Sequence, residues 1–201
     1  VTNRYPVFSI DENGNYIYTH TKEPVEVANG NIVTYTLRIF NEGTKAGYAT
    51  QVKDDIPDGL AFLPEHATNI EYRWVMLDAD GNVTTDLTKA ENIMTDYLSK
   101  EQADATGRNN LLQPFEKEQM EQPDYRDIRI AFKVTEPNTS DRILINYAQI
   151  AEDENTEGKP VVDIDSTPDE WIENEDDQDI EKVKVQYFDL SLRKWVTEAW
   201  I

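Results

Sequence analysis

The stretch NIVTYTLRIF, residues 31–40, alternates apolar and polar side chains with the period of a β-strand. One phase carries Val33, Tyr35, Leu37 and Ile39. The sequence NEGT that follows, residues 41–44, contains the polar and glycine residues that reverse a chain between strands. This segment predicts a strand with one apolar face.

Similar strand-like segments recur along the chain and are separated by turn residues. They are residues 49–56, 72–77, 127–134, 142–150 and 183–187. Between residues 87 and 121 the pattern changes, because helix-forming residues follow Ser99, a candidate N-cap. Short, regularly spaced strands with one helical insertion predict an all-β sandwich with one or two short helices at about 87–121.

The composition excludes several classes of function. A formal net charge of −21 argues against binding to nucleic acid or to an anionic membrane surface. No apolar run is long enough for a transmembrane helix. The chain has no cysteine nucleophile and no glycine-rich phosphate loop, and its two histidines, His20 and His66, lack a metal-ligand or triad pattern. We therefore expect a secreted protein rather than an enzyme that turns over substrate.

Residues 152–181 contain fourteen acidic residues and one basic residue, Lys159. Such a run predicts an extended, solvated segment. Its aspartates Asp163, Asp165 and Asp169 are oxygen ligands of the type that calcium prefers, so the segment is either a linker or a calcium site. Two shorter acidic stretches, residues 11–14 and 78–81, are interpreted as turns.

The end of the chain changes its apolar phase. Val183, Val185 and Tyr187 occupy odd positions, whereas the next apolar residues occupy even positions. Such a switch indicates a bulge or a strand that moves to another sheet or domain. In the second phase, Lys194 stands where an apolar residue is expected, between Leu192 and Val196.

Three polar residues share apolar phases: Asp54, Asn146 and Lys194. A dry core would keep the lysine neutral and the aspartate protonated. A neutral amine beside a carboxamide can form an isopeptide bond, with Asp54 donating a hydrogen bond to the Asn146 carbonyl and ammonia leaving. The chain would do this once, as a self-crosslink.

Each residue also has an ordinary structural interpretation. Lys194 can lie at a strand edge with its ammonium in water. Asn146 can be a buried amide that bonds backbone groups at a bulge. Asp54 can cap the turn that Pro57 begins. These alternatives stay open at the level of sequence.

Several motifs together resemble one family. They are residues 31–43, VKDDIPDGL at 52–60, YLSK at 97–100, FKVTEPN at 132–138, DIDSTPD at 163–169 and FDLSLRK at 188–194. The set resembles the conserved-repeat immunoglobulin-like domains of bacterial cell-surface proteins, in the long version of clostridia and other Firmicutes. The resemblance covers nearly the whole chain.

The resemblance implies an immunoglobulin-like β-sandwich of an extracellular stalk or fibre on Gram-positive bacteria. Related adhesin and pilin domains carry Lys–Asn isopeptide bonds with the lysine on the first strand, and Lys194, Asn146 and Asp54 match those roles. Here the lysine strand comes last. We therefore expect residues 1–187 to lack one strand and residues 188–201 to supply that strand to the next copy, by tandem linkage or strand exchange.

Two other functions remain at this stage. The chain could be an adhesin or binding module in which either the tryptophans, such as Trp74 or Trp171, or the helical insertion forms a ligand surface. It could also be a passive spacer that calcium stiffens. The expected partners are copies of the chain itself, and no cofactor is implied except calcium.

Overall fold

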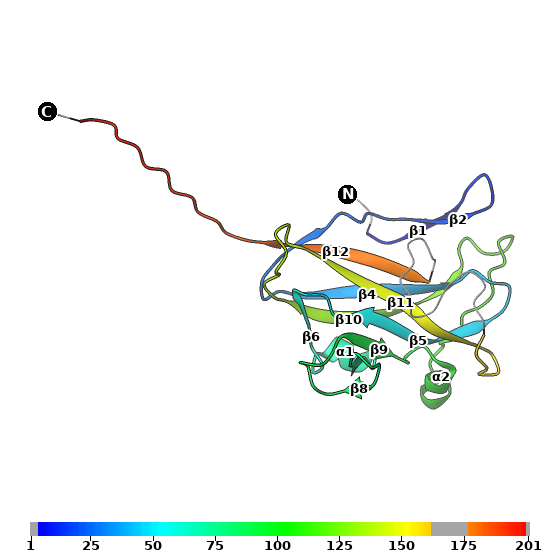
Figure 1. Cartoon of the computed structure of the whole chain (residues 1–201). Helices are drawn as coiled ribbons and strands as arrows, with labels where there is room; N and C mark the ends of the chain where they lie inside the picture. Colours follow the sequence, from blue (N-terminus) through cyan, green and yellow to red (C-terminus); the bar gives the residue numbers. More distant parts are fainter. Residues whose placement is uncertain (1–3, 162–176, 200–201) are drawn as a thin grey trace.

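Two β-sheets and a separate hairpin make up most of the regular secondary structure in the computed structural model, which describes residues 4–161 and 177–199 (Figure 1). The described residues are mostly β-strand, with two short helices, so the expected all-β class is confirmed. None of the helices in the described ranges is long and apolar enough to cross a membrane.

The larger sheet has seven strands in the order β3-β12-β11-β5-β9-β7-β8. All its pairings are antiparallel except that of β12 with β3, which is parallel. Its strands are β3 (Val25–Ala28), β5 (Gly47–Asp55), β7 (Val75–Leu77), β8 (Val83–Thr84), β9 (Asn92–Thr95), β11 (Ile143–Asn155) and β12 (Gln178–Gln186).

The smaller sheet has three strands in the order β4-β10-β6. They are β4 (Ile32–Asn41), β6 (Leu60–Phe62) and β10 (Asp124–Val134). The strand expected from the opening stretch is thus confirmed as β4, and it pairs antiparallel with β10 over nearly its whole length. The remaining strands, β1 (Val7–Ile10) and β2 (Tyr16–Thr19), form the separate hairpin.

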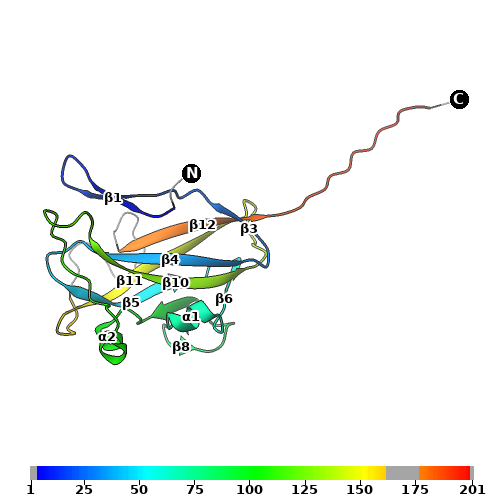
Figure 2. The same ribbon diagram turned by 180° about the vertical axis from the view of Figure 1, so that it is seen from behind.

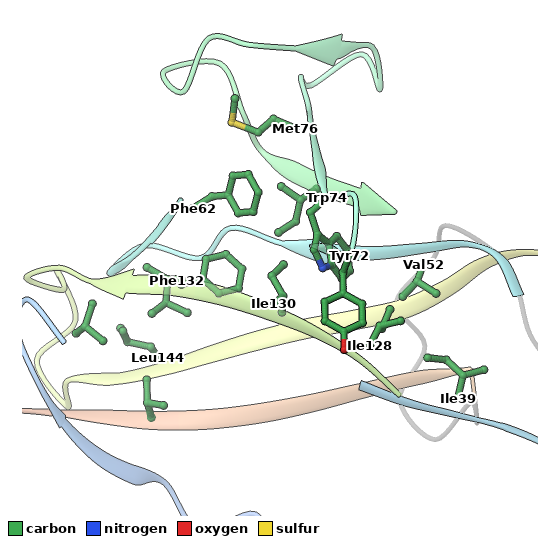
Figure 3. Close-up of a cluster of buried hydrophobic side chains, with 14 of the residues drawn as sticks. Ile39, Val52, Phe62, Tyr72, Trp74, Met76, Ile128, Ile130, Phe132 and Leu144 are labelled. Atoms are coloured by element: carbon green, nitrogen blue, oxygen red, sulfur yellow. The ribbon is translucent and has the colours of Figure 1, made fainter. Parts of the chain in front are cut away.

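The core lies between the two sheets and is built by the period of the strands (Figure 3). Ile128, Ile130 and Phe132 alternate along β10 and are fully buried, as their spacing predicts. Val52 and Leu144 come from the larger sheet and belong to the same buried cluster. Apolar faces from two sheets therefore bury one another, which is the main stabilising term of such a fold.

Three hairpin loops repeat one local structure, which explains why two of the acidic stretches are turns. In the loop at Asp11, the carboxylate accepts hydrogen bonds from the backbone N–H groups of Asn13 and Asn15, both at 2.8 Å. Asp78 and Asn155 make the equivalent bonds in their loops. The fourth residue is glycine each time, with φ between +76° and +87°, where a side chain is strained.

The helical insertion contains one of the one or two short helices that the sequence predicts. Within residues 87–121 the only helix is α2 (Lys100–Thr106), and Ser99 caps it by accepting from the Gln102 N–H at 3.2 Å. Residues 92–95 form β9 in the larger sheet, and a turn follows Glu116. The second helix, α1 (Ala67–Glu71), lies outside the predicted insertion. Sheet pairing of β9 with β5 and β7 overrides local helix propensity there.

The two ends of the acidic segment are extended, as predicted, but they pair within the larger sheet and are partly buried, which corrects the expectation of a solvated segment there. Residues 152–155 complete β11, and residues 178–181 begin β12. The Lys22 ammonium lies 2.6 Å from a carboxylate oxygen of Asp179 at the start of β12. Residues 162–176 lie outside the described part of the chain.

The chain leaves the body of the molecule after β12. Residues 187–199, called the tail below, contain no helix or strand, and they run away from the sheets in the direction of β12 (Figures 1 and 2). The predicted change of phase at Tyr187 and Phe188 therefore falls where the sheet ends.

Candidate functional site

Asn146 and Asp54 come together on neighbouring strands of the larger sheet. β11 and β5 pair antiparallel with Ala148 opposite Asp54, so the two side chains share the buried face. The Asn146 amide nitrogen Nδ2 donates a hydrogen bond to Asp54 Oδ1 at 2.6 Å. The sequence thus identified two residues that the fold places in direct contact.

The polarity of this contact differs from the expectation that Asp54 donates to the Asn146 carbonyl. The reason is a second carboxyl group, Asp55, whose Oδ1 accepts from the same Nδ2 at 3.0 Å and from the Tyr147 N–H at 2.7 Å. An amide nitrogen has two hydrogens and can serve two acceptors. The two aspartates therefore orient the Asn146 amide with its nitrogen toward them.

Asp54 is buried and lacks a full set of partners. It is 2% exposed, and its second oxygen, Oδ2, has no hydrogen-bond partner among the described residues. Burial raises the pKa of Asp54 well above its usual range, the Asn146 hydrogen bond opposes the rise, and the nearby Asp55 adds to it. Burial therefore favours the protonated carboxylic acid at Asp54 over the carboxylate, and the protonated form can give a proton to a neighbour.

Two residues that sequence reasoning missed border the pair. Glu181 on β12 lies directly opposite Asn146 on β11 and shares its face of the sheet. Tyr35 on β4 belongs to the facing sheet, and its buried hydroxyl has no partner among the described residues. Burial raises the pKa of Tyr35, and the negative charges of Asp54, Glu181 and Asp55 raise it further.

The structural alternatives for Asn146 and Asp54 do not account for this geometry. The bulge in β11 lies between Ile150 and Asp153, not at Asn146. Asp54 bonds Asn146 and not the turn at Pro57. A purely structural buried amide looks like Asn69, which bonds backbone groups of Leu63 and Ala131 at 2.8 Å.

Lys194 is far from this site in its own chain. It lies in the exposed tail and makes no contact with the core. Around it, Leu190, Leu192 and Val196 are 79%, 87% and 81% exposed. One phase of the tail therefore exposes these three apolar side chains to water, and Lys194 lies in the same phase.

The candidate calcium ligands Asp163, Asp165 and Asp169 lie outside the described residues. Within residues 4–161 and 177–199 there is no group of three or more side chains suited to hold a metal ion.

The adhesin alternative named two candidate ligand-binding tryptophans, Trp74 and Trp171. Trp74 lies in the core, 6% exposed, and its indole N–H donates to the Arg129 carbonyl at 2.8 Å, so it cannot stack on an external ligand (Figure 3). Trp171 lies outside the described residues.

Comparison with known proteins adds no identity. Neither a search of protein-family models nor a search of curated proteins found a match to this chain. What the site can do chemically therefore follows from its own atoms. It offers a carboxamide held by two carboxyl groups in a largely apolar core, and burial raises the pKa of the acid beside the amide nitrogen.

Proposed function

We propose that this chain is a structural unit of an extracellular bacterial fibre or surface stalk, related to the conserved-repeat immunoglobulin-like domains. Its fold would be an immunoglobulin-like sandwich that lacks one strand. Residues 188–201 of one copy would supply that strand to the next, by tandem linkage or between subunits. Strand addition of this kind joins copies head to tail into an open filament.

The proposal rests on one observation: the amide and acid that an isopeptide bond needs are buried, whereas the lysine is exposed. The Asn146–Asp54 pair is buried in the core, whereas Lys194 stands in water on an exposed apolar segment. Large exposed apolar residues indicate a surface that binds a partner. Docking of the tail in a neighbour's core would cover these residues and bring the amine to the amide.

The proposed reaction is a single amide exchange. The neutral Lys194 amine attacks Asn146 Cγ, and the bond from Cγ to Nδ2 breaks. Asp54 gives its proton to the leaving nitrogen and takes one from the attacking amine, so one ammonia is released per bond and the carboxyl group is restored. Reactants that are held in place can reach effective molarities of about 10⁵ M, which speeds the formation of the bond.

Intact mass and strongly denaturing gels of the purified chain test this proposal. We expect a ladder of oligomers whose mass is lower by one ammonia per linkage. Lys194→Arg keeps the charge but offers a guanidinium that stays protonated, so it should give only monomer. Lys184→Arg is the matched control, since this exposed lysine lies on β12 outside the tail, and it should keep the ladder. Monomer alone from the unaltered chain would contradict the proposal.

A further inference from the structure

The smaller sheet has one long edge without a partner strand. Among the described residues, β4 pairs with β10 on one side and with no strand on the other. The other end strands of the two sheets, β3, β6 and β8, have four, three and two residues, whereas β4 has ten. Only β4 can therefore pair with a long extended segment over its whole length.

The core side of β4 is incompletely covered. Its inward-facing residues Val33, Tyr35 and Leu37 are only half-buried, although they pack against the core cluster. An edge strand with free backbone groups and partly exposed apolar side chains favours addition of another strand. The buried Tyr35 hydroxyl without a partner lies on the same strand.

The tail has the length and pattern of such a strand. Residues 188–199 are extended and exposed, and Leu190, Leu192, Lys194 and Val196 share one phase. Arg193 and Lys194 balance Asp189 and Glu198, so this segment is neutral in a chain with a net charge of −21. A neutral segment can approach an acidic body with less repulsion than any acidic part of the chain.

The direction of the added strand follows from the fold. The tail continues in the direction of β12, and β12 runs parallel to β3 (Figure 1). The chain reverses between β3 and β4 in a turn in which the Asn31 N–H donates to the Ala28 carbonyl at 3.0 Å. If all copies in a filament point the same way, a neighbour's tail runs antiparallel to β4. A chain's own tail that folded back would run parallel to it.

We propose that the tail of a second copy adds to the free edge of β4 as an antiparallel strand, with Lys194 opposite Tyr35. This inference rests on the proposed function and specifies its docking surface. Leu192 then lies opposite Leu37 and Val196 opposite Val33, so the apolar residues that share the phase of Lys194 face the core, whereas Trp195 faces outward. A shift by one residue would turn all of them to water.

Tyr35 sets the proposed register because its hydroxyl is buried without a partner on the inner face of β4. The negative charges of Asp54, Glu181 and Asp55 also act on that hydroxyl and raise its pKa. A lysine opposite Tyr35 projects from the same face of the smaller sheet, toward the larger sheet that carries Asn146 and, directly opposite it, Glu181. Any register shifted by two residues moves the amine along β4 by about 7 Å.

Pairs of introduced cysteines test the docking edge, the direction and the register together, because the chain contains no cysteine. Thr34 and Thr36 are exposed on the outer face of β4 and can each be changed to cysteine in an acceptor protein. Arg193 and Trp195 take the same change in a donor protein. All variants also carry Lys194→Ala, so that only a disulfide can join two chains.

The expected result is a disulfide-linked heterodimer for Thr36→Cys with Arg193→Cys and for Thr34→Cys with Trp195→Cys. Directly opposite residues lie about 4.5–5.5 Å apart between Cα atoms, within the range of a disulfide, whereas diagonal ones are about 7 Å or more apart. The two crossed mixtures should stay monomeric. Links in the crossed mixtures alone would mean parallel addition and would overturn the inference, as would no link in any mixture.

The outcomes separate this inference from the proposed function. An ammonia-releasing ladder of the unaltered chain without the expected disulfides leaves the fibre proposal standing and refutes the β4 edge. The expected disulfides without a ladder support the edge and refute the isopeptide bond. A chain that carries both Thr34→Cys and Arg193→Cys, the pair that parallel addition brings together, and closes on itself as a monomer would show that the tail serves its own sheet, which refutes the second copy.

Discussion

The side chain of Asn146 donates to the carboxyl group of Asp54 at 2.6 Å, across two neighbouring strands and 92 residues of sequence. Both residues are buried, and the core, a poor solvent for charge, raises the pKa of Asp54 and so favours its protonated form. A contact of this kind costs stability unless it is fully satisfied, and here one acid oxygen is without a partner among the described residues. The following predictions test what this arrangement does.

Asp54→Asn should flatten the dependence of stability on pH. The pKa of Asp54 is raised in the folded chain above its ordinary value of 3.8, so from that pH upward the unfolded chain loses a proton that the folded chain keeps. Stability therefore falls as pH rises, by up to about 1.4 kcal/mol per pH unit from this group, until pH passes the folded pKa. Denaturant unfolding of Lys194→Ala chains with and without Asp54→Asn, from pH 4.5 to 7.5, measures the difference. Two curves of equal slope would contradict the prediction.

Asp55→Ala should slow bond formation by roughly ten- to hundred-fold, because the Asn146 amide loses the acceptor that helps to orient it. Asp55→Asn keeps an oxygen acceptor at the same place and should restore most of the rate. The rate is followed as the growth of the ladder on denaturing gels. Equal rates in both variants would show that Asp55 does not position the amide.

Leu192→Ser should abolish assembly without changing the stability of the single chain. The side chain is 87% exposed and touches no part of its own core, so its loss removes nothing from the monomer. In the docked strand the same side chain is buried, and each buried leucine contributes about 1.5–3 kcal/mol. Arg193→Ser, on the opposite phase, is the control and should keep the ladder. The unfolding midpoint is measured in the Lys194→Ala background, where a shift with Leu192→Ser would mean that the tail packs on its own body.

Gly59→Ala should destabilise the chain more than Gly81→Ala. Both glycines have positive φ, +91° and +78°, which costs a side chain about 1–2 kcal/mol. At Gly59 the added Cβ would also lie 2.6 Å from a methyl carbon of Leu144, whereas at Gly81 nothing lies within 4 Å. Overpacking of a core adds about 1–3 kcal/mol. Denaturant unfolding of the two variants measures the difference, and equal losses would contradict the packing account.

Much of the fold follows from local sequence. The alternation in β4 and β10, the N-cap at Ser99 and the Asx-type loops at Asp11 and Asp78 all act within a few residues, and the structure confirms them. The end of the strand pattern near Tyr187 is likewise local. The insertion was less predictable, since the strand β9 depends on partners far away in the chain.

Local periodicity places Asp54, Asn146 and Lys194 on apolar phases, because the period of a strand assigns each residue to a face. The contact between the first two, the positions of Asp55 and Glu181 beside Asn146, and the free edge of β4 all depend on how the strands pair and pack. Sheet order and register join segments that are far apart in sequence, and no local pattern encodes them. The packing of two whole sheets selects them, since only one arrangement buries all the apolar faces together.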